Sequence, residues 1–184
     1  MAKKAGRSLV INASIARASG LPGASHPVAK ACRDFLRGVL LICHRVVITP
    51  AIAREWKDHS SHFARTWRVS MEARKKVVRP DVSKDTSFEA SLGQAASGEK
   101  ARAVLLKDAH LIQAALAGDS IVVSADNEAR DAFTKAAASV TDIQGIVWVN
   151  PSEEKDPCQW LRDGARPENS RLLGRPGSQP PPVK

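Results

Sequence analysis

The chain has 184 residues, of which 43% are hydrophobic and 26% are charged, and its formal net charge is +9. This length makes one compact domain the default, and this composition excludes a fully disordered protein. The longest apolar stretches, such as residues 39–43, are far shorter than the roughly 18 to 20 residues that span a bilayer, so we expect no membrane anchor.

The N-terminus predicts a protein that stays in the cytoplasm. Residues 1–7 are basic, but Asn12 and Arg17 interrupt the apolar segment that follows, which makes a poor secretory signal. The three cysteines are an odd number and show no CxxC spacing, so they indicate neither a disulfide framework nor a zinc site.

The positive charge is concentrated in three segments. Residues 1–7 and 164–184 each carry a net charge of +3, and residues 54–79 carry +5. A basic block of this kind can bind a phosphate backbone, although a solvated helical face has the same composition. The candidate nucleic-acid contacts are Arg54, Lys57, Arg65, Arg68, Arg74, Lys75 and Lys76.

Short apolar runs alternate with helical periodicity, which predicts an α/β domain with a mainly parallel central sheet. The expected strands are residues 8–11, 46–48, 120–124 and 145–149. The expected helices outside the basic block are residues 27–44, 98–117, 127–138 and 151–160.

A helical segment with one apolar face is predicted over residues 51–79, after a capping Thr49 and a first-turn Pro50. Its large apolar side chains are spaced seven, four and four residues apart, which favours a core role over a base-stacking platform. These side chains are Trp56, Phe63, Trp67 and Met71. Residues 79–98 are expected to form a loop or broken segment, and the Pro/Gly-rich residues 164–184 a disordered tail.

Four polar side chains occupy positions that suggest a site. Asp108 lies on the apolar stripe of its helix, where a carboxylate is costly unless it is neutralised, paired or bound to a metal. Asn12 and Asp126 follow apolar strands, and open α/β sheets form their sites beyond the carboxyl ends of strands. Glu55 is expected to face partly inward. Each has a structural alternative, an arginine partner for Asp108 and a capping or helix-start role for the others.

If these four side chains converge, they form a set of oxygen donors without imidazole or thiolate. Hard oxygen donors suit Mg²⁺ or Mn²⁺ rather than zinc. Such an ion can activate water and neutralise the charge that builds on a phosphodiester during hydrolysis. The basic segment at residues 54–79 would then hold the rest of the nucleic-acid strand.

Five short motifs, in order, resemble those of the PIN-domain nucleases, and especially the VapC-type toxins of bacterial toxin–antitoxin pairs. Residues 9–14 (LVINAS) resemble the opening strand with its Asp-x-Ser/Thr, and residues 48–55 (ITPAIARE) resemble the helix start that carries a Glu. Residues 107–115 (KDAHLIQAA) are similar to the Asp-Ala-x-Ile-x-Ala helix, residues 122–126 (VVSAD) to the strand ending in Thr/Ser-x-Asp, and residues 147–151 (VWVNP) to the closing strand.

The resemblance covers residues 8–163, with residues 1–7 as a basic extension, and implies a three-layer α/β/α PIN-like domain. It implies a Mg²⁺- or Mn²⁺-dependent endoribonuclease, a hydrolase that acts on RNA as the toxin of such a pair. It also implies a small antitoxin partner and the homodimer common in this family. The catalytic and metal-binding residues carried over are Asn12, Glu55, Asp108 and Asp126. The supporting residues are Ser14, Ser124 and Asn127.

One position departs from the family pattern, because the first Asp is Asn12 here. An amide oxygen can coordinate a cation but supplies no charge, so we expect weaker metal binding and slower hydrolysis. Three explanations stay open: a natural variant with altered activity, a non-catalytic descendant that only binds, or a deliberate substitution in a harmful toxin. The alternative function is therefore a nucleic-acid- or partner-binding module that uses residues 51–79 as its contact surface.

Overall fold

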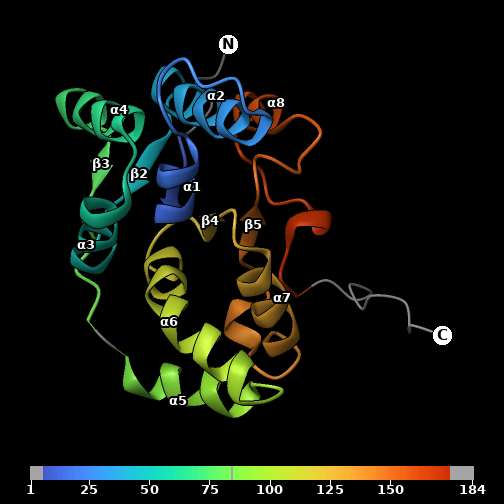
Figure 1. The fold of residues 1–184 in the computed structure, drawn as a ribbon. Helices are drawn as coiled ribbons and strands as arrows, with labels where there is room; N and C mark the ends of the chain where they lie inside the picture. Colours follow the sequence, from blue (N-terminus) through green and yellow to red (C-terminus); the bar gives the residue numbers. More distant parts are fainter. Residues whose placement is uncertain (1–5, 84, 175–184) are drawn as a thin grey trace.

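Five short runs rich in valine and isoleucine form one parallel sheet in the order β3-β2-β1-β4-β5 (Figure 1). The computed structural model describes residues 6–83 and 85–174. The strands are β1 (Ser8–Ile11), β2 (Arg45–Val47), β3 (Val77–Val78), β4 (Ile121–Val123) and β5 (Val147–Val149). The predicted α/β class with a parallel central sheet is confirmed.

Helices cover both faces of this sheet and produce a three-layer α/β/α fold (Figure 1). In one layer α1, α2, α4 and α8 contact one another, in the other α5, α6 and α7 do so, and α3 contacts both α1 and α6. No helix within the described residues is long and apolar enough to cross a membrane. The helices are α1 (Ala13–Ala18), α2 (Pro27–Leu41), α3 (Pro50–His59), α4 (His62–Ala73), α5 (Thr86–Ala95), α6 (Glu99–Leu116), α7 (Asn127–Ala136) and α8 (Pro157–Arg162), with 3₁₀ turns η1 (Thr141–Ile143) and η2 (Asn169–Arg171).

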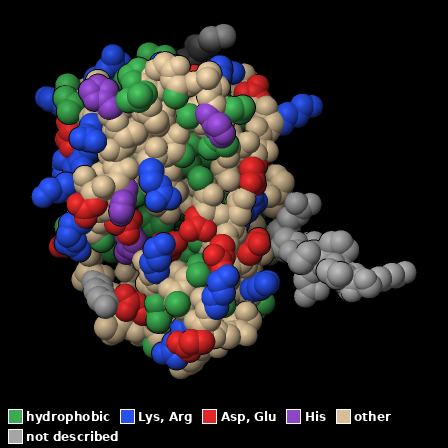
Figure 2. Space-filling view, in the orientation of Figure 1, with side chains coloured by type: hydrophobic (Ala, Val, Ile, Leu, Met, Phe, Trp, Pro, Cys, Tyr) green, Lys and Arg blue, Asp and Glu red, His purple; other side chains and the backbone are tan. Residues whose placement is uncertain are grey.

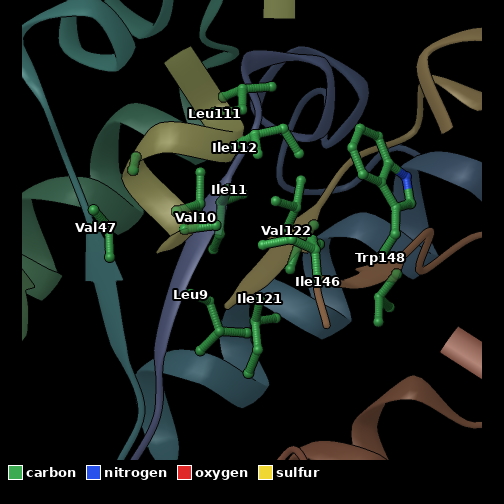
Figure 3. Packing of buried hydrophobic residues seen from close by; sticks show 14 of the residues in the cluster. Leu9, Val10, Ile11, Val47, Leu111, Ile112, Ile121, Val122, Ile146 and Trp148 are labelled. Atoms are coloured by element: carbon green, nitrogen blue, oxygen red, sulfur yellow. The ribbon is translucent and has the colours of Figure 1, made fainter. Parts of the chain in front are cut away.

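The two central strands are buried on both faces. All four residues of β1 and all three of β4 are buried, which is why these runs show no polar alternation. Figure 3 shows Leu111 and Ile112 of α6 beside the side chains of these strands. This packing fixes α6 against the sheet, and with it the position of Asp108 one turn earlier.

The segment at residues 51–79 is not one continuous helical surface. Ser60 has an extended backbone and ends α3, and the Ser61 hydroxyl accepts a hydrogen bond from Ala64 N to start α4. Trp56 and Trp67 still meet across this break, with ring centroids 5.7 Å apart, and both are buried. The predicted core role of these tryptophans is therefore confirmed, whereas the shared helical face over the whole segment is wrong.

Two other helix expectations were wrong. Residues 79–98, expected as a loop or broken segment, contain a loop that follows β3 and then the ten-residue helix α5. An Asp85 cap starts this helix, and its Phe88 and Leu92 are buried. The last helix begins at Pro157, after an Asp156 cap, instead of near residue 151. Side-chain packing in the first case and a capping residue in the second decide these boundaries.

The expectation of disorder from residue 164 onward is wrong for residues 164–174, which the structure describes. Leu172 forms an antiparallel bridge to Val147 of β5, and Leu173 N donates to Ile146 O at 3.0 Å. Leu173 is buried, so the segment from 165 to 174 closes the β5 edge of the sheet. Residues 175–184 and 1–5 of the expected extensions lie outside the described residues.

Candidate functional site

The sheet order defines where a site can form. The chain runs from β1 to β2 and β3 on one side and later to β4 and β5 on the other, so β1 and β4 are neighbours at the point of reversal. In open α/β sheets, ligands bind in the crevice beyond the carboxyl ends of the strands at this point. Asn12 directly follows β1 and Ser124 directly follows β4, and Asn12 N donates to Val123 O at 2.9 Å.

A small polar pocket of about 150 Å³ lies at this crevice. The four residues predicted as catalytic and metal-binding all line it, although they come from four separate elements. Asn12 follows β1, Glu55 comes from α3, Asp108 from α6, and Asp126 precedes α7. Its lining residues are Asn12, Ala13, Ser14, Arg17, Glu55, His59, Lys107, Asp108 and Asp126.

Asp108 is the most deeply placed acid of the pocket. Only 3% of the residue is exposed, and its Oδ2 has no hydrogen-bond partner. Burial raises the pKa of Asp108, and the carboxylates of Asp126 and Glu55 also raise it, while Lys107 opposes them. Arg17 lines the same pocket, but among the described residues no ion pair joins an arginine to Asp108, and its Oδ2 stays without a partner. A buried, unpartnered carboxylate oxygen therefore points to a missing ligand or proton.

Glu55 is held at the pocket by a contact with His110. Trp56 Nε1 donates to Ile11 O at 2.9 Å and anchors α3 at the end of β1. His110 Nε2 lies 3.2 Å from Glu55 Oε1, and this contact holds the pKa of Glu55 below its ordinary value. Burial alone would lower the pKa of His110, but the Glu55 and Asp108 carboxylates raise it above its usual value. Glu55 therefore already has a partner, whose charged form this contact favours.

Two serines join the two strand ends below the pocket. Ser124 Oγ accepts hydrogen bonds from Asp126 N and from Asn12 Nδ2, both at 3.1 Å, which occupies its two lone pairs. Its own hydrogen therefore donates to Ser14 Oγ at 3.3 Å. Ser14 Oγ also accepts from Ala125 N at 3.1 Å, so the Ser14 hydroxyl hydrogen is left for the pocket.

The orientation of the Asn12 amide follows from the same network. Asn12 Oδ1 accepts from Ser14 N at 3.0 Å and caps α1, which places the Nδ2 group towards Ser124. An aspartate would present a second acceptor oxygen where Asn12 presents N–H donors. Asn12 thus serves as a helix cap and a hydrogen-bond donor, which is the structural alternative considered for this position.

Asp126 and Asn127 have different surroundings although they are adjacent. Asp126 lines the pocket while its Oδ1 caps α7 by accepting from Ala129 N at 2.9 Å. Asn127 turns away, because its amide donates to Glu153 and its Oδ1 accepts from Asn150. Asn127 therefore does not line the pocket, whereas Ser14 lines it and Ser124 is hydrogen-bonded to Asn12 beside it.

Three basic or titratable side chains outside the predicted catalytic and supporting residues also line the pocket. They are Arg17 of α1, His59 at the end of α3, and Lys107 beside Asp108. Arg17 lies three residues after Ser14, so both are on one side of α1, and this spacing could have indicated that Arg17 lies at the pocket. Arg17 and Lys107, beside the acids, give the pocket both signs of charge.

The basic segment is largely available to solvent. Figure 2 shows Lys and Arg side chains gathered along the side of the molecule occupied by α3 and α4. Lys76 is the exception, because its ammonium donates to the Leu40 carbonyl at 2.8 Å and to that of Ile42. Lys76 thus holds the end of α2, and its ammonium is occupied by these two carbonyls. The other six candidates are exposed or half-buried.

The donor set has limited capacity for a metal ion. Within residues 6–83 and 85–174, no three His, Cys, Asp or Glu side chains are grouped so that they could hold one. Mg²⁺, however, is commonly bound through one or two carboxylates with water completing its shell. Asp108 with its unpartnered oxygen and the nearby Asp126 fit that second kind of site.

Comparisons of the chain with protein-family models, with curated proteins and with solved structures gave no match.

Proposed function

We propose that this chain is a PIN-like ribonuclease that hydrolyses RNA phosphodiester bonds with the help of Mg²⁺ or Mn²⁺. The observation that carries the proposal is the polar pocket at the reversal point of the sheet. Its lining includes every residue that the family resemblance assigned to catalysis, drawn from segments up to 114 positions apart between Asn12 and Asp126.

The divalent cation would be held by Asp108 and Asp126, with Asn12 as a weak neighbour. When bound, such an ion lowers the pKa of its water and neutralises charge on the phosphate. The raised pKa of metal-free Asp108 agrees with this role, because a cation would compensate the charge that burial disfavours.

The residues of the chain contribute binding and orientation around the phosphate. Arg17 of α1 and Lys107 of α6 line the pocket and would contact phosphate oxygens there. The Ser14 hydroxyl can donate its remaining hydrogen to a phosphate oxygen or a water. The exposed cations of α3 and α4 would hold the flanking strand and make binding salt-dependent.

The proposal is tested by cleavage of a labelled RNA by the wild type, Asn12→Asp and Asp108→Asn over a titration of MgCl₂ and MnCl₂. We expect metal-dependent cleavage that Asp108→Asn abolishes and Asn12→Asp accelerates. Binding of Mn²⁺, followed by electron paramagnetic resonance, gives a second readout that does not depend on activity. Cleavage that persists in EDTA, or in Asp108→Asn, would refute the proposal.

A second function, binding of RNA or a partner without catalysis, is favoured by Asn12. Its amide presents donors instead of a second carboxylate oxygen, so the pocket has one acidic ligand fewer than the family pattern. This alternative predicts RNA binding that is independent of divalent cations and unchanged in Asp108→Asn. Filter binding in EDTA and in MgCl₂ separates the two functions.

The resemblance to VapC-type toxins extends the proposal to a toxin role with a small antitoxin partner. Large apolar side chains are exposed on two helices that pack together, Leu41 at the end of α2 and Val69 on α4, at 76% and 68%. Growth arrest on expression of Asn12→Asp, relieved by a protein encoded beside this chain, would support that role. Unimpaired growth together with active cleavage in vitro would contradict it.

A further inference from the structure

A second and larger cavity adjoins the acidic pocket. It lies between α3 and α6, which contact each other, and has a volume of about 610 Å³. Glu55 and His59 line both cavities, and the contact between Glu55 and His110 lies at their boundary. A molecule whose phosphate occupies the acidic pocket would therefore extend into this α3/α6 groove.

The difference in size assigns different parts of a nucleotide to the two cavities. The acidic pocket, at about 150 Å³, has room for a phosphate group with water but lies below the range of about 300–1,000 Å³ that is typical of small-molecule sites. The α3/α6 groove falls within that range. The groove thus has the capacity for the base and sugar that the pocket cannot hold.

The chemistry of the groove suits a flat, uncharged ring better than a phosphate. Its apolar lining includes Pro50, Val82 and Leu106, which offer van der Waals contact to the faces of a base. Glu55 and Asp58 also line it beside a single arginine, Arg54, so its carboxylates outnumber its arginine and do not favour a second phosphate.

A polar group suited to a base edge is present as well. Gln113 Nε2 donates to Asp85 O at 3.3 Å, which orients the amide and leaves its Oε1 to accept from an N–H group. Gln113 lies on the same stripe of α6 as Leu106 and His110, so the three side chains face the groove together.

We propose that the α3/α6 groove is a nucleobase subsite, which takes the base of a nucleotide whose phosphate lies at the acidic pocket. The inference rests on the proposed function for its biological meaning. Base binding itself is a property of the groove and can be measured without catalysis.

The test uses the full chain and calorimetric titration with the four nucleoside 5′-monophosphates and with ribose 5-phosphate, which lacks a base, in MgCl₂. The variant Leu106→Gln removes an apolar contact at the groove, where Leu106 is 37% exposed. Its matched control is Leu116→Gln, on the same helix but away from the groove, with Leu116 40% exposed.

At least one nucleotide is expected to bind about tenfold or more tightly than ribose 5-phosphate, because its base buries apolar surface that ribose 5-phosphate lacks. Leu106→Gln is expected to weaken that nucleotide about fivefold and to leave ribose 5-phosphate unchanged, while Leu116→Gln changes neither. Equal binding of all five compounds, or equal losses in the two variants, would overturn the subsite. Base-dependent binding without RNA cleavage would support the subsite and refute the proposed nuclease activity. RNA cleavage without base-dependent binding would support the nuclease activity and refute the subsite.

Discussion

Replacing Asp108 by asparagine should stabilise the protein when no divalent cation is present. Burial, together with the nearby Asp126 and Glu55 carboxylates, raises the pKa of Asp108 above its ordinary value of 3.8. For an acid with a raised pKa, stability is lost as the pH rises through the unfolded-state value, and the loss is complete above the folded-state value. The wild type therefore loses stability at neutral pH to the extent that Asp108 is ionised in the folded protein. Asp108→Asn removes this charge and with it the loss.

The magnitude follows from the unpartnered Oδ2 of Asp108, which is fully buried. Asparagine keeps a polar atom at this position but removes its charge, and the extra cost of burying the charged form without a partner is about 1–3 kcal/mol. For a domain of this size each kcal/mol moves the unfolding midpoint by about 2–4 °C. We therefore expect Asp108→Asn to raise the midpoint by about 2–12 °C in EDTA. At ten times its dissociation constant, Mg²⁺ would stabilise the wild type by about 1.4 kcal/mol and leave the variant unchanged.

Differential scanning calorimetry of both proteins, in EDTA and in a MgCl₂ series at pH 7, measures the two effects together. Asp131→Asn is the control, because Asp131 is an exposed acid of α7 outside the pocket lining. A midpoint that falls in Asp108→Asn, or a Mg²⁺-induced shift of equal size in the wild type and this variant, would show that the buried carboxylate is not a strained cation ligand.

Three further outcomes follow from other contacts. Asn12→Asp should increase the affinity for Mn²⁺ about tenfold, because a charged carboxylate oxygen replaces an N–H donor. Titration followed by electron paramagnetic resonance measures this affinity, and an unchanged value would exclude residue 12 from the site. The neutral ring of His44 accepts a hydrogen bond from Arg7 N and donates one to the Leu161 carbonyl, and burial lowers its pKa. The wild type should therefore lose stability as the pH falls through about 6.5. In urea unfolding, His44→Gln should not show this loss, and equal dependence of stability on pH in the two proteins would contradict the prediction. Arg171 forms ion pairs with two glutamates and packs on an indole ring. Arg171→Ala should therefore lower the free energy of unfolding by about 1–3 kcal/mol and speed hydrogen exchange over residues 165–174. Unchanged exchange would show that another contact holds this segment.

The residues of the pocket could be predicted because simple geometry governs them. Helical periodicity places Asp108 on the same face as Leu111 and Ile112, and all three are buried. Asn12 and Asp126 follow neighbouring parallel strands, whose carboxyl ends lie at one edge of the sheet. Spacing within an element and the ends of strands therefore carry most of the information about this site.

The orientation of individual side chains and the long-range contacts could not be predicted in the same way. Asn127 is adjacent to Asp126, yet partners 23 and 26 positions away turn its amide from the pocket. Helix α5 contains Ser and Gly residues of low helical propensity, but burial of Phe88 and Leu92 outweighs that preference. The Leu172 bridge to β5 also depends on tertiary pairing, which local composition does not record.

The most direct measurement is a crystal structure of the protein soaked in MnCl₂, with anomalous scattering used to locate the ion. The account predicts one strong peak in the pocket beyond β1 and β4, bonded directly to Asp108 Oδ2 and contacting Asp126 directly or through water. An empty pocket at saturating Mn²⁺, with Asp108 still unpartnered, would contradict a metal-dependent function for this chain.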